Sequence, residues 1–445
     1  MKRTGMSHPT LMLLVCALPL LIFFALALAG VQLNPVLVPL IMILCCLAMF
    51  YLTAGACGHE HTERVPEVIS EEPTIPPAEA LKTDDVFRVH HSRRLGEALV
   101  QEGELLRNPD QAYDVLKARS ENTAVTPLLQ EDLHGRPLLV WVPGELGQSA
   151  GKDRSPWLNV LLLLATFVTT TWAGAMHAGV DLLQEPGRFA AGLPYSLTLL
   201  LILGAHELGH YFTARVHGMR VTLPYFIPVP FGLGTFGAFI QLKSHAENRR
   251  ALFDVGVAGP LAGLVFAISV LWIGLQYSRV LAPEEMADHM HGGIGLGSSA
   301  LLALIAKFAL GDALTEGHRV LLHPLAFAGW LGLLVTALNL LPIGQLDGGH
   351  MADAMFGRTR SAAIGTAALV ALVFLGLFVW SGLLTWALVV YFIAGGKGLP
   401  PLNDVSRMDA GRQAVGAFAF VLLFLILAPV PHALYDTLGI HCPYL

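Results

Sequence analysis

The sequence predicts an all-α polytopic membrane protein with about eight to nine transmembrane helices, a small α/β soluble segment, and a broken β-like or re-entrant stretch near the candidate active site. Of the 445 residues, 54% are hydrophobic and 13% are charged, which is more apolar material than a soluble core of this length uses. The mean hydropathy of +0.60 agrees with this. Apolar runs long enough to cross a bilayer recur along most of the chain, and one polar segment interrupts them.

The first 57 residues predict a transmembrane hairpin. Apolar runs at 11–28 and 36–54 are separated by the turn signal Asn34-Pro35. The first run is long for the apolar part of a signal peptide, so we expect it to stay in the membrane. Lys2 and Arg3 then place the amino terminus on the inner side.

Residues 58–156 form the polar segment, which we interpret as a cytoplasmic linker followed by a small soluble domain. Prolines and glutamates cluster up to about Thr83, as in a linker. Helical spacing at 110–118 and a strand-like run at 137–142 favour an α/β module after it. The module contains no set of residues that is typical of a catalytic site. Four basic or imidazole side chains in it are expected to be solvated surface, namely His90, His91, Arg93 and Arg94.

We predict a membrane core at 157–360 and further transmembrane helices at 361–445. The apolar runs that predict spans lie at 158–174, 194–214, 251–275, 324–342, 362–379, 383–394 and 413–428. The run at 301–310 is too short to cross a bilayer. The stretch 224–242 contains three prolines and three glycines, so a regular helix is not expected there.

The stretch 197–216 carries the residues with the clearest chemistry. His206, Glu207 and His210 lie among aliphatic residues, where unsatisfied polar groups cost several kcal/mol. The i, i+4 spacing places both imidazoles on one helix face, where they can bind one metal ion, and Glu207 lies beside them to act on water. This is the HExxH pattern of zinc peptidases, and it predicts one Zn²⁺ per chain.

Catalytic zinc takes a third protein ligand, and Asp347 is the best placed carboxylate. Basic residues after the histidine helix and after Asp347 put both at the inner membrane face. Asn339 is a polar amide in an apolar run that we expect to bind the oxyanion or the substrate backbone. The alternatives are that Asp347 is a turn residue and that Asn339 only joins helices. Three nearby histidines are expected on the surface or behind the ligands: His217, His245 and His350.

Composition excludes other classes. A net charge of −6 with scattered basic residues provides no positive surface for nucleic acid, so no nucleic-acid partner is expected. Five cysteines without a CxxC pair favour neither a disulfide framework nor a cysteine metal site.

HELGH at 206–210 together with LNLLPIGQLDGG at 338–349 resembles the site-2 protease family of intramembrane zinc metalloproteases. The resemblance covers about 159–357. It implies His206, His210 and Asp347 as metal ligands, Glu207 as the base and an oxyanion-side role for Asn339. The wider layout is similar to the branch that contains plant chloroplast relatives and their bacterial counterparts. Two features depart from family patterns, because a clear GNLR motif and a PDZ-like insertion are absent from the sequence.

These observations predict an intramembrane zinc endopeptidase that cleaves a transmembrane segment of a membrane-anchored regulatory protein, after an upstream site-1-type protease has trimmed it. The alternatives are a non-proteolytic pseudoprotease or chaperone that binds membrane segments and, less favoured, a metal transporter. We expect a multi-pass protein of a bacterial inner membrane with its active site towards the cytoplasm, because no Arg- and Ser-rich transit segment is present.

Overall fold

A computed structural model describes residues 83–144, 156–281, 299–311, 319–378, 382–394 and 400–428, apart from positions 122, 124, 133 and 231. The predicted amino-terminal hairpin and the linker up to residue 82 lie outside the described residues. Apart from 229–232, the described residues belong to one compact unit.

Five helical stretches are long and apolar enough to cross a membrane within the described part of the chain. They are α4 (Trp157–His177), a continuous stretch made of the 3-10 helix η2 (Pro186–Gly192) and α5 (Leu193–Val216), α6 (Arg249–Gln276), α11 (Arg358–Phe378) and α13 (Ala410–Leu427). Three apolar helices are shorter, namely α8 (Ala300–Leu310), α9 (Pro324–Leu340) and α12 (Gly382–Ala394). The chain is an integral membrane protein, whereas the predicted count of eight to nine spanning helices is not confirmed.

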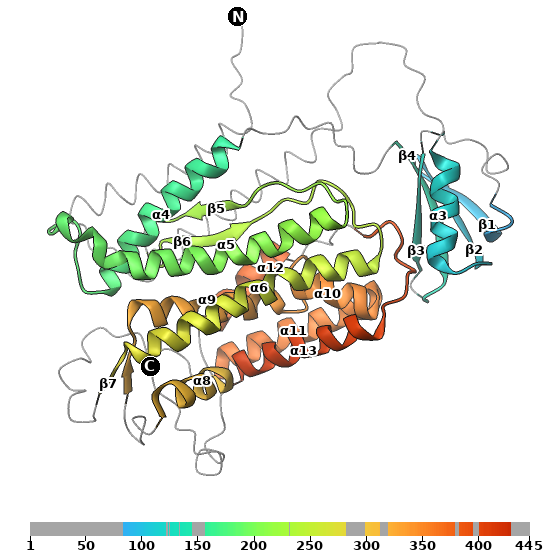
Figure 1. Ribbon diagram of the computed structural model, residues 1–445. Coiled ribbons are helices and arrows are strands. Elements are labelled where there is room, and N and C mark those ends of the chain that lie inside the picture. The colour runs from blue at the N-terminus through green and yellow to red at the C-terminus, as the bar shows by residue number, and fades with distance from the viewer. Residues whose placement is uncertain are drawn as a thin grey trace, which may run out of the picture. The chain divides into compact units, whose positions relative to one another are not determined.

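Helix α6 packs against both α5 and α9, and these two helices also contact each other (Figure 1). The carboxyl-terminal half of α6 approaches α9 closely, because Gly274 lies against the backbone of Ala326 and Gly329 of α9 lies against Leu271. The buried core here is formed by aliphatic side chains such as Leu271, Leu275 and Leu333. Small residues at these crossings let the two backbones pack closely. Such packing stabilises helix contacts in a membrane, where the hydrophobic effect does not drive helices together.

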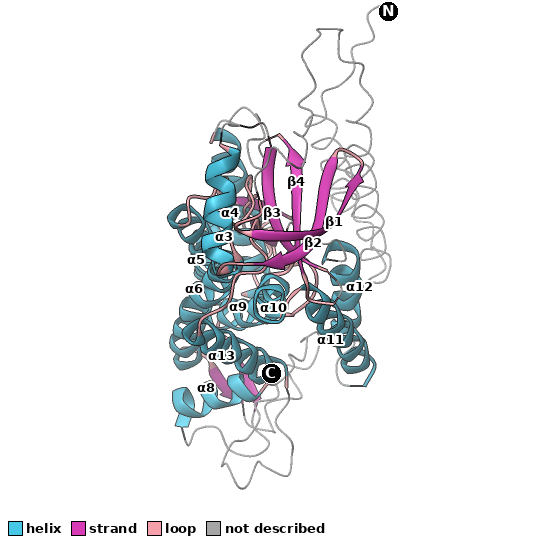
Figure 2. Cartoon of the chain, turned by 90° about the vertical axis from the view of Figure 1, so that its right-hand side faces the viewer, coloured by secondary structure: helices cyan, strands magenta, loops and turns pink. Residues whose placement is uncertain are grey.

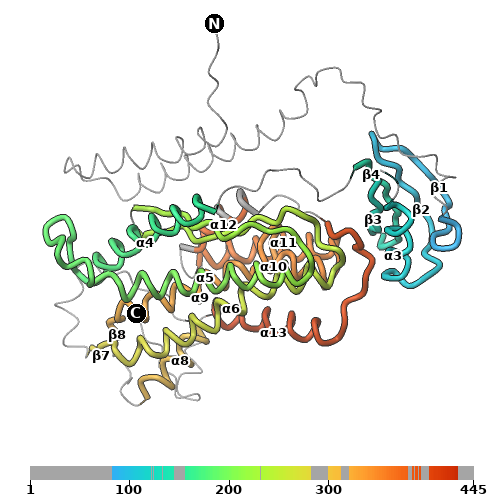
Figure 3. The backbone as a smooth tube through the Cα atoms, turned by 45° about the horizontal axis from the view of Figure 1, so that its top comes forward, coloured from blue at the N-terminus to red at the C-terminus, as the bar shows by residue number. Residues whose placement is uncertain are grey.

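The proline- and glycine-rich stretch forms the predicted β-like element. Strands β5 (Tyr225–Pro228) and β6 (Thr235–Phe239) pair antiparallel, and β5 packs against α4 while β6 contacts α5 (Figure 3). Gly234 adopts φ +80 and lies so close to the backbone of Thr170 that a Cβ would be 2.5 Å from its Cα. The Thr169 hydroxyl donates to the carbonyl of Gly234 at 2.7 Å. The hairpin is therefore fixed against α4.

The segment that the sequence predicts to be soluble forms an antiparallel sheet with one helix on its face (Figure 2). Its elements are β1 (Phe87–Leu95), β2 (Ala98–Leu105), α3 (Pro109–Ser120), β3 (Val125–Glu131) and β4 (Pro137–Pro143), with strand order β1-β2-β4-β3. Trp141, Leu116 and Phe87 are fully buried between helix and sheet. The helix and the last strand agree with the sequence prediction. The other three strands were not predicted, and β1 is exposed over most of its length, so it lacks an apolar alternation.

At the other end of α6, β7 (Arg279–Leu281) pairs with β8 (Arg319–Leu321). The remaining element, α10 (Asp347–Phe356), follows α9 after a short turn and contacts α6.

Candidate metal centre

Helix α5 presents the two imidazoles to the interior of the helical core. His206, Glu207 and His210 are only 4%, 5% and 6% exposed. The two imidazoles lie one turn apart on the same face, and their Nε2 atoms are 3.2 Å apart. Two buried nitrogen atoms at this distance are unfavourable unless a shared proton lies between them, or a cation that a third group also binds.

Asp347 reaches this site because the chain turns sharply before α10. Gly348 lies against the carbonyl of Leu340, and Gly349 lies against the carbonyl of Gly344, so that a Cβ would approach these oxygens to 2.0 and 2.3 Å. Only glycine fits both positions. The turn places Asp347 at the first position of α10, with its Oδ2 3.2 Å from the Nε2 atoms of both histidines.

The three donor atoms form a triangle whose edges are all 3.2 Å. A tetrahedral zinc ion with bonds of about 2.0–2.1 Å holds its ligand atoms about 3.3 Å apart. Two imidazole nitrogens and one carboxylate oxygen are also ligands that zinc prefers, and three protein ligands leave one position open, as in catalytic sites. His206, His210 and Asp347 therefore fit a zinc ion. Within the described residues they are also the one group of three ligand side chains close enough to hold a metal.

Helix α6 orients His210 from behind. The Nδ1 atom of His210 lies 2.7 Å from the carbonyl oxygen of Val255, which can only accept, so Nδ1 carries the proton and Nε2 faces the other ligands. Gly259, one turn further along α6, lies against the same ring, and a Cβ there would be 2.1 Å from Nε2. Gly263 lies similarly against His206, at a looser 3.2 Å from its Cβ.

Asn339 and Glu207 complete the site. The Asn339 side-chain nitrogen is 3.3 Å from Nε2 of His206, so this amide of α9 lies next to the three ligand atoms. Glu207 is the residue after His206 on α5, and strand β6 contacts the same helix.

The other histidines named from the sequence lie outside the ligand group. His217 pairs with Asp254 at 3.0 Å, and Arg412 of α13 pairs with the same carboxylate at 2.6 Å. The role of the Val255 carbonyl is not predictable from the sequence, because backbone groups leave no residue-type signal. The Gly259-Pro260 pair and Gly263 predict close approach to a neighbour, and the structure identifies that neighbour as the histidine pair.

A buried His-His-Asp set with an adjacent glutamate inside membrane helices defines a membrane-embedded metalloprotein with the residue set of a zinc peptidase. Residues 194–382, which are less than half of the chain, match the model of peptidase family M50. No solved structure is significantly similar to the chain.

Curated relatives extend the similarity. The chain is 38% identical over 253 residues to the probable zinc metalloprotease EGY1, chloroplastic, of Arabidopsis thaliana, covering 56% of this chain and 45% of the relative. It is 28% identical over 357 residues to the probable zinc metalloprotease EGY2, chloroplastic, of the same plant, covering 78% and 63%. The rice protein probable zinc metalloprotease EGY3, chloroplastic, is 29% identical over 383 residues, covering 81% and 65%.

The chain thus spans between 45% and 65% of the length of these relatives. The comparisons support the expected similarity to the plant branch of the family. They do not support the expectation of a bacterial inner membrane, since the relatives are named as chloroplast proteins.

Proposed function

We propose that the protein is an intramembrane zinc endopeptidase. The observation that carries this proposal is the triangle of 3.2 Å between two imidazole nitrogens and one carboxylate oxygen, with Glu207 adjacent to one of the ligands. The M50 match and the zinc metalloprotease names of the relatives support the same reaction class.

The buried side chains divide the chemistry between them. Zinc, when bound, acts as a Lewis acid that polarises water and the scissile carbonyl. Glu207 takes the proton of the attacking water and passes it to the leaving amine. The Asn339 amide, 3.3 Å from His206 Nε2, is close enough to donate to the oxygen that gains negative charge.

The substrate that we propose is a transmembrane segment of a membrane-anchored regulatory protein. A peptide bond in a helix is shielded from attack, so the segment must unwind near the metal. The β5–β6 hairpin supports this step, because an unwound segment can pair with its backbone as an added strand within the membrane. Strand β6 contacts α5, the helix that carries the proposed base Glu207. Prior trimming by a site-1-type protease belongs to this proposal.

We also propose which membrane side the metal faces. The ends of α5, α6, α11 and α13 nearest the site carry basic residues, namely Arg215, Arg249, Arg358 and Arg412. By the positive-inside rule this is the inner side of the membrane. Water then reaches the metal from that side and the substrate arrives from the lipid.

The test compares wild type with Glu207→Gln in detergent or liposomes, using a labelled model transmembrane substrate. We expect Glu207→Gln to keep its zinc and lose at least about 10³-fold in cleavage rate. Glu185→Gln, an exposed carboxylate on the loop before η2, is the matched control and should cleave normally. Undiminished cleavage by Glu207→Gln would contradict the proposal, and zinc binding without any cleavage by wild type would favour the membrane-segment binder.

A further inference from the structure

The segment 400–406, with the sequence PPLNDVS, links the soluble module to the start of α6. On one side the amide of Leu129 in β3 donates to the carbonyl of Leu402, and the amide of Asp404 donates back to Leu129. On the other side the amides of Leu402 and Asn403 donate to the carbonyls of Ala246 and Glu247. The sheet of the module therefore continues through this segment to the residues that precede α6. Both the module and the segment lie outside the M50 match.

Asn403 is the central residue of this connection. It is 1% exposed and forms parallel bridges with Leu129 on one side and Asn248 on the other. Its side-chain amide donates to the carbonyl of Pro109 at 3.1 Å, at the start of α3. Asn248 in turn is the N-cap of α6, since its side chain accepts a hydrogen bond from the amide of Ala251. One buried residue thus connects sheet, module helix and helix cap.

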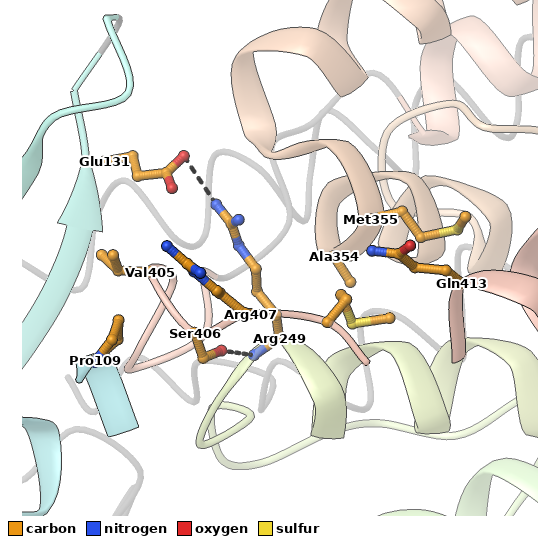
Figure 4. Close-up of a pocket in the computed structure, with 10 residues that line it drawn as sticks. Pro109, Glu131, Arg249, Ala354, Met355, Val405, Ser406, Arg407 and Gln413 are labelled. Carbon is orange, nitrogen blue, oxygen red and sulfur yellow. Dashed lines mark hydrogen bonds and ion pairs between the residues drawn. The ribbon is translucent and has the colours of Figure 1, made fainter. Parts of the chain in front are cut away.

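Arg249 adds a charged connection at the same place (Figure 4). A cation at the first position of a helix is disfavoured by the helix dipole, and this side chain is only 12% exposed. Glu131 of the module and Asp404 of the segment compensate it, each at 2.9 Å. Figure 4 shows Glu131 and Arg249 at the wall of a cavity of about 380 Å³ that Met355 of α10 also lines. The start of α6 is therefore held by two acidic residues from elsewhere in the chain.

The same helix contacts the metal ligands less than two turns later. Val255, whose carbonyl accepts from His210, is six residues after Arg249, which is about 9 Å along the helix. Gly259 follows one turn further, against the His210 ring. Because α6 contacts the His210 ring this closely, a rotation or shift of α6 changes the position of Nε2 of His210.

We propose that the soluble module, through Asn403, Glu131 and Asp404, positions α6 and thereby sets the metal affinity of the site. These are positioning residues and touch neither the metal nor the substrate. The inference rests on the zinc site of the proposed function, but it concerns parts of the chain beyond the M50 match.

The test uses the full-length protein with Asn403→Ala and Glu131→Gln. The matched control is Asp132→Asn, which also neutralises a carboxylate, but one that pairs with Arg136 inside the module. Zinc affinity is measured by competition with a chelator, and the ligand geometry by the visible spectrum of the Co²⁺-loaded protein. Hydrogen exchange at β2 and β4 reports whether the module stays folded.

We expect the two variants to bind zinc about 10-fold more weakly, with a shifted Co²⁺ spectrum and faster exchange at Leu129 and Leu402, while the control matches wild type. Wild-type zinc affinity and spectrum in variants whose connecting amides exchange faster would overturn the inference alone. A wild-type chain that binds no zinc would overturn it together with the proposed function.

A milder pair guards against variants that fail to fold. Lys117 of α3 pairs with Glu247 at 2.6 Å, and both side chains are about half exposed. Lys117→Glu should weaken zinc binding about 2-fold, and Glu247→Lys in the same chain should restore it. Equal affinity in the single and double variants counts against the inference.

Discussion

The two halves of α6 use glycine for different purposes. In the carboxyl-terminal half, Gly274 lets the backbone of α9 approach, since a Cβ would be 2.3 Å from the amide nitrogen of Ala326. In the amino-terminal half, Gly259 leaves room for an imidazole, since a Cβ would be 2.1 Å from Nε2 of His210. One helix therefore carries two kinds of close contact. The first stabilises the helical core, and the second determines whether ligand atoms reach the metal.

Gly259→Ala should have the largest effect. Alanine favours a helix by about 1 kcal/mol over glycine, but its methyl group would occupy the space beside the metal-facing nitrogen. We expect zinc affinity to fall about 100-fold while the helical content stays that of wild type. Chelator competition and circular dichroism measure the two quantities. Wild-type zinc affinity in this variant would remove the distinction between the two halves of α6.

Gly274→Ala should lose stability and keep the metal. The added methyl group would press on the backbone of α9, and overpacking of this kind costs about 1–3 kcal/mol. The free energy of unfolding in mixed micelles should fall by that amount, with zinc affinity unchanged. A loss of zinc affinity as large as that of Gly259→Ala would show that the two contacts are not independent.

Removal of zinc by a chelator should loosen the amino-terminal half of α6 alone. The His210 ring donates a hydrogen bond to the Val255 carbonyl and also binds the metal, so the ring becomes mobile when the metal is removed. We expect backbone amides at 255–263 to exchange about 10-fold faster after chelation, whereas those at 270–276 keep their rate. Hydrogen exchange followed by mass spectrometry checks this. Equally faster hydrogen exchange along the whole of α6 would contradict this prediction.

Gly263→Ala should have the smallest effect of the four. A Cβ at this position would lie 3.2 Å from the Cβ of His206, a distance that a small shift relieves. We expect the free energy of unfolding to change by less than about 1 kcal/mol and zinc affinity by less than about 5-fold. Titration of the apo protein with zinc measures the zinc affinity of this variant and of Gly259→Ala. An equal loss of zinc affinity in both variants would contradict the prediction that the closer contact, at Gly259, has the larger effect.

Much of this protein follows from local sequence pattern. The apolar runs predict the spanning helices, and the i, i+4 spacing of His206 and His210 predicts one metal-binding face, because both signals depend on residues a few positions apart. Three prolines and three glycines in 224–242 predict a non-helical stretch, and the hairpin confirms it. Asp347 is 137 residues from His210, yet the prediction that both lie at the same side of the membrane was enough to select Asp347 as a ligand.

Only the tertiary structure decided how these parts depend on one another. The carbonyl of Val255 and the bridges of Asn403 are backbone contacts between distant segments, and the composition of either segment does not specify such a partner. The sequence by itself therefore determined which residues can hold a metal. The folded chain determined how they are oriented, because close packing of α6 against α5, and of the soluble module against the start of α6, sets positions that no local pattern encodes.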